Sequence, residues 1–373
     1  MSRTGVGGLF CSLRQLGFDL KPLSDMNLFG VTHRQEDDQT HTREGEAPEK
    51  RQPDWGCVSD TINNPLARRG EPVGFLSFLF GKKKGNGGGA KKGLKRVDIP
   101  KRFDLSGRTG QGSMSKVYRA YDNTIGRNVC LKLLDRVKTK KFELRFTSRG
   151  LKKPSEGEIC MALRHDNIVR TYEHGLSLEG DPYLVMEWVE GHGLNYLIET
   201  RNALLNGNRI NYFCQLCDAV QYMHDLKFLH RDLCPRNVMV NQEGVLKLID
   251  FGLTIPYETE FCKPGNRTGT ADYLAPELIS RRTTDHRVDL FALGVTAFEL
   301  FTNALPWERS PSSEETLRRH LNTPSRDPKD LKPGIEEDLR RLLQRAVERD
   351  PTARFPTAAA FKAAMLKLER QDY

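Results

Sequence analysis

The sequence predicts an α+β fold in which a small strand-rich lobe with one main helix precedes a larger helical lobe. Residues 103–190 surround one helical segment near 155–164 with short runs of β-forming residues, at 117–118, 128–134 and 183–189. Residues 191–368 carry apolar residues at helical spacing, and 290–301 read as a nearly continuous apolar helix that we expect to be buried. A cleft between two such lobes favours ligand binding.

The composition of the N-terminal segment, residues 1–72, predicts that it is disordered. It is polar, mixed in charge and rich in Gly and Pro, and its apolar residues keep no sustained period. Residues 73–102 follow as an apolar patch and a basic linker rich in Gly and Lys. Within them, 73–96 has two interpretations: a patch that packs on the folded domain, or a weak contact with a membrane surface or a partner.

The charge and the cysteines exclude several protein classes. The formal net charge is +9, but residues 82–102 alone hold nine Lys or Arg and one Asp. The remaining chain is nearly balanced, so we expect no nucleic-acid partner. Eight cysteines in 373 residues do not make a disulfide scaffold. No apolar run approaches the roughly 20 residues of a membrane span, and the start of the chain does not resemble a signal peptide.

The most informative stretch runs from His230 to Gly252 and reads as loop, strand, turn, strand and loop. Asp232 could accept a proton there, whereas Asn237 and Asp250 offer oxygens to a hard cation such as Mg²⁺. The order and spacing resemble the catalytic loop and metal-binding triplet of the eukaryotic-like (Hanks-type) serine/threonine protein kinase family. The resemblance covers about residues 103–366 and implies a two-lobed protein-kinase-like fold.

A glycine-rich stretch resembles the loop that covers the ATP phosphates in this family. Gly110 and Gly112 would let backbone N–H groups approach the phosphates closely. Ser115 stands where a third glycine is usual, so we expect the loop to close less freely. Val117 follows it and would cover the adenine.

The resemblance also assigns a lysine and its carboxylate partner. Lys132 would pair with the α- and β-phosphates of ATP and be held by a carboxylate on the main helix of the small lobe. Glu156 is the best candidate. Glu158 is the alternative, because the segment between Lys132 and Glu156 is several residues longer than usual.

Apolar residues would form the rest of the nucleotide pocket. By resemblance, Met186 is the gatekeeper, Glu187 and Val189 lie in the hinge, and Met239 and Cys130 enclose the adenine. Without the surrounding motifs, the apolar residues among them would read as ordinary core.

The catalytic loop departs from the family at Cys234. Serine/threonine kinases usually carry a Lys there, whose charge neutralises the transferring phosphoryl group. Arg236 matches the position where tyrosine kinases place an Arg, and our hypothesis is that it substitutes for the missing Lys. Cys234, close in sequence to Arg231 and Arg236, could have a lowered pKa and be oxidisable.

The stretch 269–277 resembles the substrate-docking segment of serine/threonine-type kinases. Thr270 would hydrogen-bond the catalytic Asp232, so serine/threonine specificity is favoured and tyrosine is left open. Asp289 resembles the buried helix residue that holds the catalytic loop, and Arg354 resembles the partner of Glu277 in a buried ion pair. The resemblance implies structural roles for Asp289 and Arg354.

Regulation has two interpretations. Arg231 would normally bind a phosphate on the activation segment, yet no hydroxyl lies between Thr259 and Thr268. Thr268 is the nearest candidate for phosphorylation, and constitutive activity is the alternative. Cys214 and Cys217 fall within one amphipathic helix, where packing is expected rather than metal binding.

The resemblance implies an ATP-dependent protein serine/threonine kinase that uses ATP and Mg²⁺ and phosphorylates proteins in the cytoplasm. A pseudokinase acting as an interaction module is the main alternative, supported by Cys234 and Ser115. A small-molecule phosphotransferase is a third interpretation. The sequence does not name the substrate or the oligomeric state.

Overall fold

The computed structural model describes residues 96–111, 115–265, 267–370 and 373. Contacts divide the chain into two units, 1–70 and 71–373, and all described residues belong to the second. The predictions for residues 1–95 and for Gly112 lie outside the described residues.

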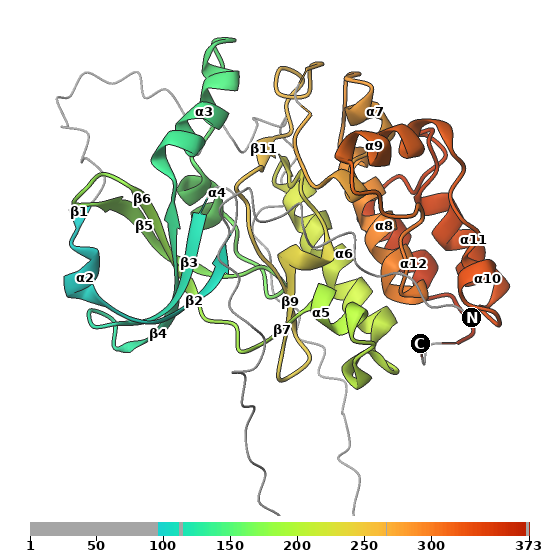
Figure 1. The fold of residues 1–373 in the computed structure, drawn as a ribbon, viewed down its shortest axis with the longest axis horizontal. Coiled ribbons are helices and arrows are strands. Elements are labelled where there is room, and N and C mark those ends of the chain that lie inside the picture. The colour runs from blue at the N-terminus through green and yellow to red at the C-terminus, as the bar shows by residue number, and fades with distance from the viewer. Residues whose placement is uncertain (1–95, 112–114, 266, 371–372) are drawn as a thin grey trace, which may run out of the picture. The chain divides into compact units, whose positions relative to one another are not determined.

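The small lobe is built on one six-stranded sheet with the order β1-β5-β6-β4-β3-β2 (Figure 1). All neighbouring pairs are antiparallel except β1 with β5, which is parallel. The strands are β1 (Arg96–Val97), β2 (Phe103–Gln111), β3 (Ser115–Asp122), β4 (Arg127–Leu134), β5 (Thr171–Ser177) and β6 (Pro182–Glu187). The three predicted runs fall in β3, β4 and β6, whereas β5 was not predicted.

Residues 96–102 belong to the folded lobe and not to a linker, which corrects the predicted boundary. They form β1 and the short helix α2 (Ile99–Arg102). The guanidinium of Arg102 is buried, with its Nη2 2.7 Å from Asp122 Oδ2 and its Nη1 2.7 Å from Glu173 Oε1. A buried cation with two carboxylate partners ties this segment to strands β3 and β5.

The small lobe contains two helices between β4 and β5, where one was predicted. The expected helix is α4 (Glu156–Ala162), which begins with a capping box of Ser155 and Glu158. The additional helix is α3 (Arg136–Thr147), which begins where the side chain of Asp135 accepts hydrogen bonds from two backbone N–H groups. It accounts for the extra length before Glu156 and projects at the top of Figure 1.

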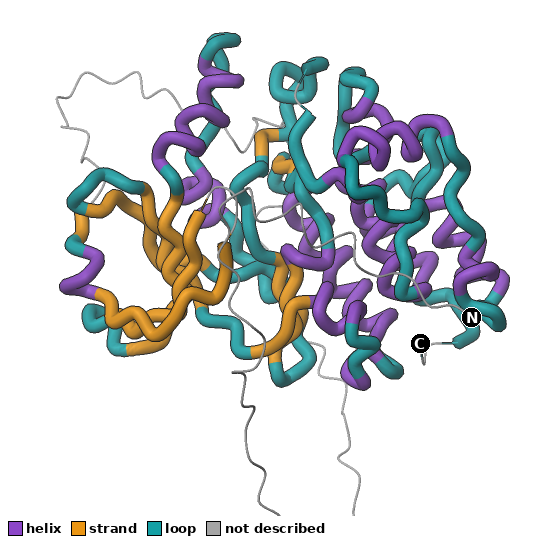
Figure 2. The backbone as a smooth tube through the Cα atoms, in the orientation of Figure 1, coloured by secondary structure: helices purple, strands orange, loops and turns teal. Residues whose placement is uncertain are grey.

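The larger lobe is mainly helical (Figure 2). Its helices are α5 (Leu194–Glu199), α6 (Arg209–Asp225), α7 (Pro276–Ile279), α8 (Arg287–Thr302), α9 (Ser313–Asn322), α10 (Pro328–Leu331), α11 (Glu337–Ala346) and α12 (Ala358–Met365). Every residue of α8 from Val288 onward is buried, which confirms the predicted apolar helix. Cys214 and Cys217 are buried in α6 and pack into the core, as predicted.

Short strands frame the loops that carry the polar residues. Strands β7 (Gly191–Gly193), β9 (Val238–Asn241) and β10 (Leu246–Leu248) form one sheet, and β8 (Phe228–Leu229) pairs with β11 (Ile255–Pro256). The hairpin of β9 and β10 confirms the predicted sequence of loop, strand, turn, strand and loop. None of the helices in the described part of the chain combines the length and apolar character that crossing a bilayer requires.

Candidate active site

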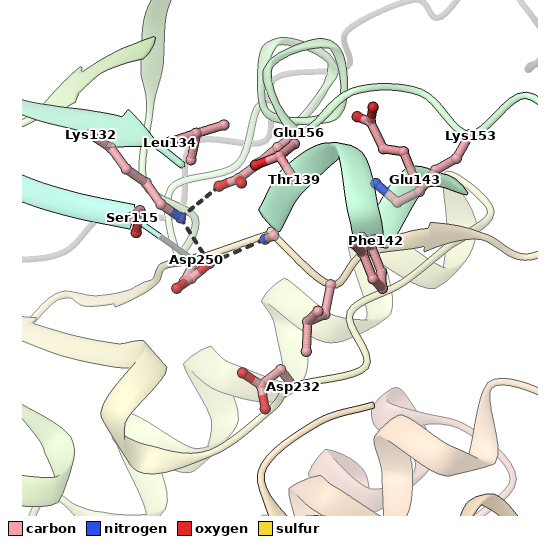
Figure 3. Close-up of a pocket in the computed structure, with 12 residues that line it drawn as sticks. Ser115, Lys132, Leu134, Thr139, Phe142, Glu143, Lys153, Glu156, Asp232 and Asp250 are labelled. Carbon is pink, nitrogen blue, oxygen red and sulfur yellow. Dashed lines mark hydrogen bonds and ion pairs between the residues drawn. The ribbon is translucent and has the colours of Figure 1, made fainter. Parts of the chain in front are cut away.

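Lys132 joins the two lobes at the centre of the site. Strand β4 buries its side chain, and its ammonium lies 2.6 Å from Glu156 Oε1 and 2.9 Å from Asp250 Oδ1 (Figure 3). Burial opposes the charge, but the carboxylates of Asp250 and Glu156 outweigh it and raise the pKa of Lys132 above its usual range. The ammonium therefore stays charged, next to the residue predicted to bind metal.

Helix α4 presents Glu156 and not Glu158 to the lysine. Glu156 is the first residue of the helix and is 7% exposed. Glu158 lies on the exposed side, where its carboxylate accepts hydrogen bonds from the backbone N–H and hydroxyl of Ser155. The capping box thus uses one carboxylate to start the helix and leaves the other for Lys132.

Asp232 is held by hydrogen bonds from two sides. Its Oδ1 accepts hydrogen bonds from the backbone N–H and the hydroxyl of Thr270, both at 2.8 Å. The side-chain amide of Asn237 donates to the Asp232 carbonyl at 2.8 Å and to Oδ2 at 3.2 Å. The expected contact of Thr270 with Asp232 is therefore present, and the carboxylate orientation is fixed by neutral donors.

The backbone of this loop is fixed by a buried carboxylate. Asp289, on α8, accepts hydrogen bonds from the backbone N–H groups of His230 and Arg231 at 2.8 and 2.9 Å. Its Oδ2 also lies 3.0 Å from Nε2 of His224. The predicted structural role of Asp289 is confirmed.

Asp250 and Arg231 both have left-handed backbone conformations, with φ of 63° and 71°. Such conformations cost about 1–3 kcal/mol in non-glycine residues and persist where the surroundings enforce them. The Asp250 Oδ1 accepts a hydrogen bond from the backbone N–H of Gly252 at 3.1 Å. Although partial desolvation by the surrounding groups acts in the opposite direction, Lys132 and this hydrogen bond lower the pKa of Asp250. It is a carboxylate at neutral pH.

One cavity brings together residues that are far apart in the sequence. Of the predicted site residues, it is lined by Ser115, Lys132, Glu156, Asp232 and Asp250 (Figure 3). Among the lining residues that sequence reasoning missed, four come from one stretch of the chain: Thr139, Phe142, Glu143 and Lys153. All four precede Glu156 and come from α3 or the segment after it. The only signal for them was the unusual length of that segment.

Four of the apolar residues predicted around adenine belong to the main core cluster. Met186 and Val189 are buried in one core cluster, with Cys130 and Met239 partly buried against it. Cys130 faces Met186 across the β4–β6 pair. Glu187 directs its carboxylate to Lys247, 3.0 Å away, and its backbone N–H donates to the carbonyl of Arg170 at 2.8 Å. Their contact with adenine remains a prediction.

The glycine-rich stretch is a hairpin over the site. Gly110, in β2, pairs with Val117 in β3, and Val117 in turn pairs with Lys132 in β4. Ser115 begins β3 and is buried against the cavity. Gly112 lies outside the described residues, so the contact of this stretch with phosphate remains a prediction.

The structure contradicts the hypothesis of a reactive thiol at Cys234. Its side chain is 2% exposed, and burial together with the neighbouring Asp232 raises its pKa to about 11, despite the charge of Arg236. A protonated, buried thiol is a poor nucleophile. Arg236 is exposed and forms no ion pair among the described residues, so its predicted role is neither supported nor contradicted by a contact.

The buried ion pair predicted between Glu277 and Arg354 is present. Two parallel contacts of 2.7 and 2.9 Å join the guanidinium to the carboxylate, and both side chains are shielded from water. Arg354 also donates to backbone carbonyls, including that of Arg287 at 3.0 Å. The pair connects the end of the substrate-docking segment with the C-terminal part of the lobe.

Comparisons with known proteins agree with this geometry. The family model "Protein kinase domain" matches residues 103–365. The chain is 34% identical over 260 residues to an Aurora kinase of Candida glabrata, with 68% of each protein covered. It is 30% identical to the serine/threonine-protein kinase PknB of Mycobacterium leprae and 29% identical to PrkC of Bacillus subtilis. Those matches cover 72% and 71% of this chain, but only 43% and 40% of the two bacterial relatives.

Proposed function

The chain belongs to the protein kinase domain family, and from this we propose that it transfers the γ-phosphoryl group of ATP to Ser or Thr hydroxyls of proteins. One observation carries the proposal: Lys132 bridges Glu156 and Asp250, in a cavity that Asp232 also lines. A pseudokinase has no need of all four groups in this arrangement. The relatives named as serine/threonine-protein kinases support the choice of hydroxyl.

Lys132 would bind the α- and β-phosphates of ATP, since it is the buried cation of the cavity and is oriented by Glu156. Backbone N–H groups near Gly110 and Gly112 would cover the phosphates from above. Met186, Val189, Cys130 and Met239 would enclose the adenine. In this arrangement the chain supplies position and charge rather than a covalent intermediate.

Asp232 would accept the proton of the substrate hydroxyl. Thr270 and Asn237 hold its carboxylate in one orientation, so the substrate meets a preorganised acceptor. The stretch around Thr270 would place the substrate next to it.

The oxygens at Asp250 and Asn237 suit Mg²⁺. Asp250 is an ionised carboxylate with a side chain 44% exposed, and Asn237 uses its amide nitrogen for Asp232, which leaves the amide oxygen for a ligand. Among the described residues no cluster of three or more His, Cys, Asp and Glu could hold a metal, so phosphate oxygens would complete the coordination. Bound Mg²⁺ would neutralise phosphate charge.

A need for ATP supports a cytoplasmic location.

The test is phosphotransfer with purified protein. We expect Mg·ATP to raise the melting temperature and labelled γ-phosphate to appear on Ser and Thr of a generic basic protein, with EDTA abolishing the transfer. Stabilisation by Mg·ATP without transfer would favour the pseudokinase alternative. Transfer to a small molecule but not to any peptide on an array would favour the third interpretation.

Arg236 is tested separately. If it supplies the charge that Cys234 lacks, Arg236→Ala should lower kcat by about 100- to 1000-fold, because a charge near the transferring group is worth about 3–4 kcal/mol. The KM for ATP should change little. Arg201→Ala, at another exposed arginine, serves as the control. An unchanged kcat in Arg236→Ala would refute this role.

A further inference from the structure

Helix α3 is attached to the rest of the protein by two aromatic side chains. Phe142 and Phe146 are 6% and 1% exposed, and they are the helix's buried residues. They lie one turn apart on the same face of the helix, with their rings in an edge-on contact at 5.5 Å. The opposite face carries Val137 and Leu144, which are 73% and 51% exposed.

The two phenylalanines do not pack on the sheet of their own lobe. They belong to a buried cluster, the α3 cluster, whose other members come from the larger lobe: Leu229, Ile255, Phe261 and Cys262. The ring of Phe146 lies 5.5 Å from the ring of Phe261. Helix α3 therefore fastens the small lobe to the activation segment, residues 250–277.

Polar contacts on both sides support the α3 cluster. Arg149, just after α3, donates from Nη2 to the backbone carbonyl of Glu260 at 3.0 Å. The backbone carbonyl of Cys262 accepts a hydrogen bond from the N–H of Thr284 at 3.0 Å. Upstream, Ile255 is fixed opposite Leu229 in the β8–β11 pair. The stretch 255–262 is thus held at its start, middle and end.

The cluster adjoins the site. Phe142 and Leu253 line the same cavity as Asp232 and Asp250, and Leu253 is also partly buried against the α3 cluster. The activation segment leaves the site at Asp250 and returns to it at Thr270, which holds Asp232. A change in the path of residues 255–262 would therefore act on both ends at once.

The α3 cluster holds the activation segment in place through apolar contacts. In other proteins a phosphate on such a segment commonly orders it. The stretch between Thr259 and Thr268 has no hydroxyl to modify, and Phe261 and Cys262 are 4% and 3% exposed there. We propose that Phe142 and Phe146 are positioning residues that hold the activation segment in its active path through Phe261, without modification of that segment. The inference rests on the proposed kinase function.

The test uses the full chain carrying Phe146→Ala. Kcat for a peptide substrate should fall by about 10- to 100-fold, because a displacement of about 1 Å in the site can cost on the order of 100-fold. The KM for ATP should stay within about twofold, since Lys132 and Glu156 are not part of the cluster. Amide hydrogen exchange should quicken in residues 255–270 and not in α8.

Matched variants separate positioning from general instability. Leu144→Ala, on the exposed face of the same helix, should leave kcat and exchange unchanged. Phe146→Leu should restore most of kcat if apolar packing is what matters. The double variant Phe146→Ala with Phe261→Ala should be no worse than the more impaired single variant, because both remove the same contact.

Two results would overturn the inference. One is a Phe146→Ala protein with unchanged kcat and unchanged exchange in 255–270. The other is a wild-type protein that loses its activity on treatment with a phosphatase, since a phosphate would then be needed. If the wild type transfers no phosphate at all, the proposed function fails, and the exchange measurement alone still decides whether α3 positions the segment.

Discussion

Asp232→Asn is expected to lower kcat for protein phosphorylation by about 10²- to 10⁴-fold, the range that a positioned proton acceptor contributes. The asparagine keeps the size of the side chain and an oxygen that can accept from Thr270. It loses the negative charge. It also loses Oδ2 as an acceptor, the oxygen to which Asn237 donates a hydrogen bond in the wild type. The loss should appear in initial rates at saturating ATP and peptide.

The fold and nucleotide binding should survive this change. Asp232 forms no ion pair among the described residues, so the melting temperature and the shift caused by Mg·ATP should remain close to wild type. Asp166→Asn, at an exposed carboxylate, is the control for a lost surface charge. If kcat of Asp232→Asn stayed within a factor of two of the wild-type value, Asp232 would not be the proton acceptor of the reaction.

Arg354→Met is expected to lower the free energy of unfolding by about 3–5 kcal/mol, because it leaves the Glu277 carboxylate buried without its cation. The methionine retains apolar contact with Phe291, over whose ring the guanidinium lies. For a domain with a total stability of about 5–15 kcal/mol, this is a large fraction. Denaturant unfolding monitored by fluorescence would measure the loss.

Two further variants check the origin of that loss. Adding Glu277→Gln to Arg354→Met removes the uncompensated charge and should restore part of the stability. Arg318→Met breaks an exposed pair with Glu315 and should lower the free energy of unfolding far less than Arg354→Met does. If Arg354→Met costs no more than Arg318→Met, the buried pair does not stabilise the lobe.

The sequence was sufficient to predict the site residues that lie close together along the chain. Asp232, Asn237 and Asp250 lie on one hairpin and its two flanking loops, so their order along the chain determines their proximity in space. The pairing of Lys132 with Glu156 also required helix α4 to place Glu156 next to strand β4. The choice between Glu156 and Glu158 depended on which residue caps the helix, a detail that the motif does not contain.

Long-range apolar contacts could not be predicted in this way. Half of the residues of helix α3 are charged and only two of its side chains are buried, so its apolar periodicity is weak. Its partner Phe261 is also far away in the sequence. Strand β5 mixes buried and half-buried positions and gave no clear alternation. The thiol of Cys234 was judged from neighbouring charges in the sequence, whereas its burial decides its pKa.

The buried guanidinium of Arg102 shows that the folded small lobe extends beyond the family match. The family match starts one residue later, at Phe103. A protein trimmed to the matched residues would keep the Asp122 carboxylate sealed from water and discard the cation that neutralises it. The family match therefore begins at Phe103, whereas the part of the chain that folds together includes Arg102. Arg96 begins β1, which is an edge strand of the sheet. A partner that bound the chain before Arg96 would therefore act directly on the small lobe.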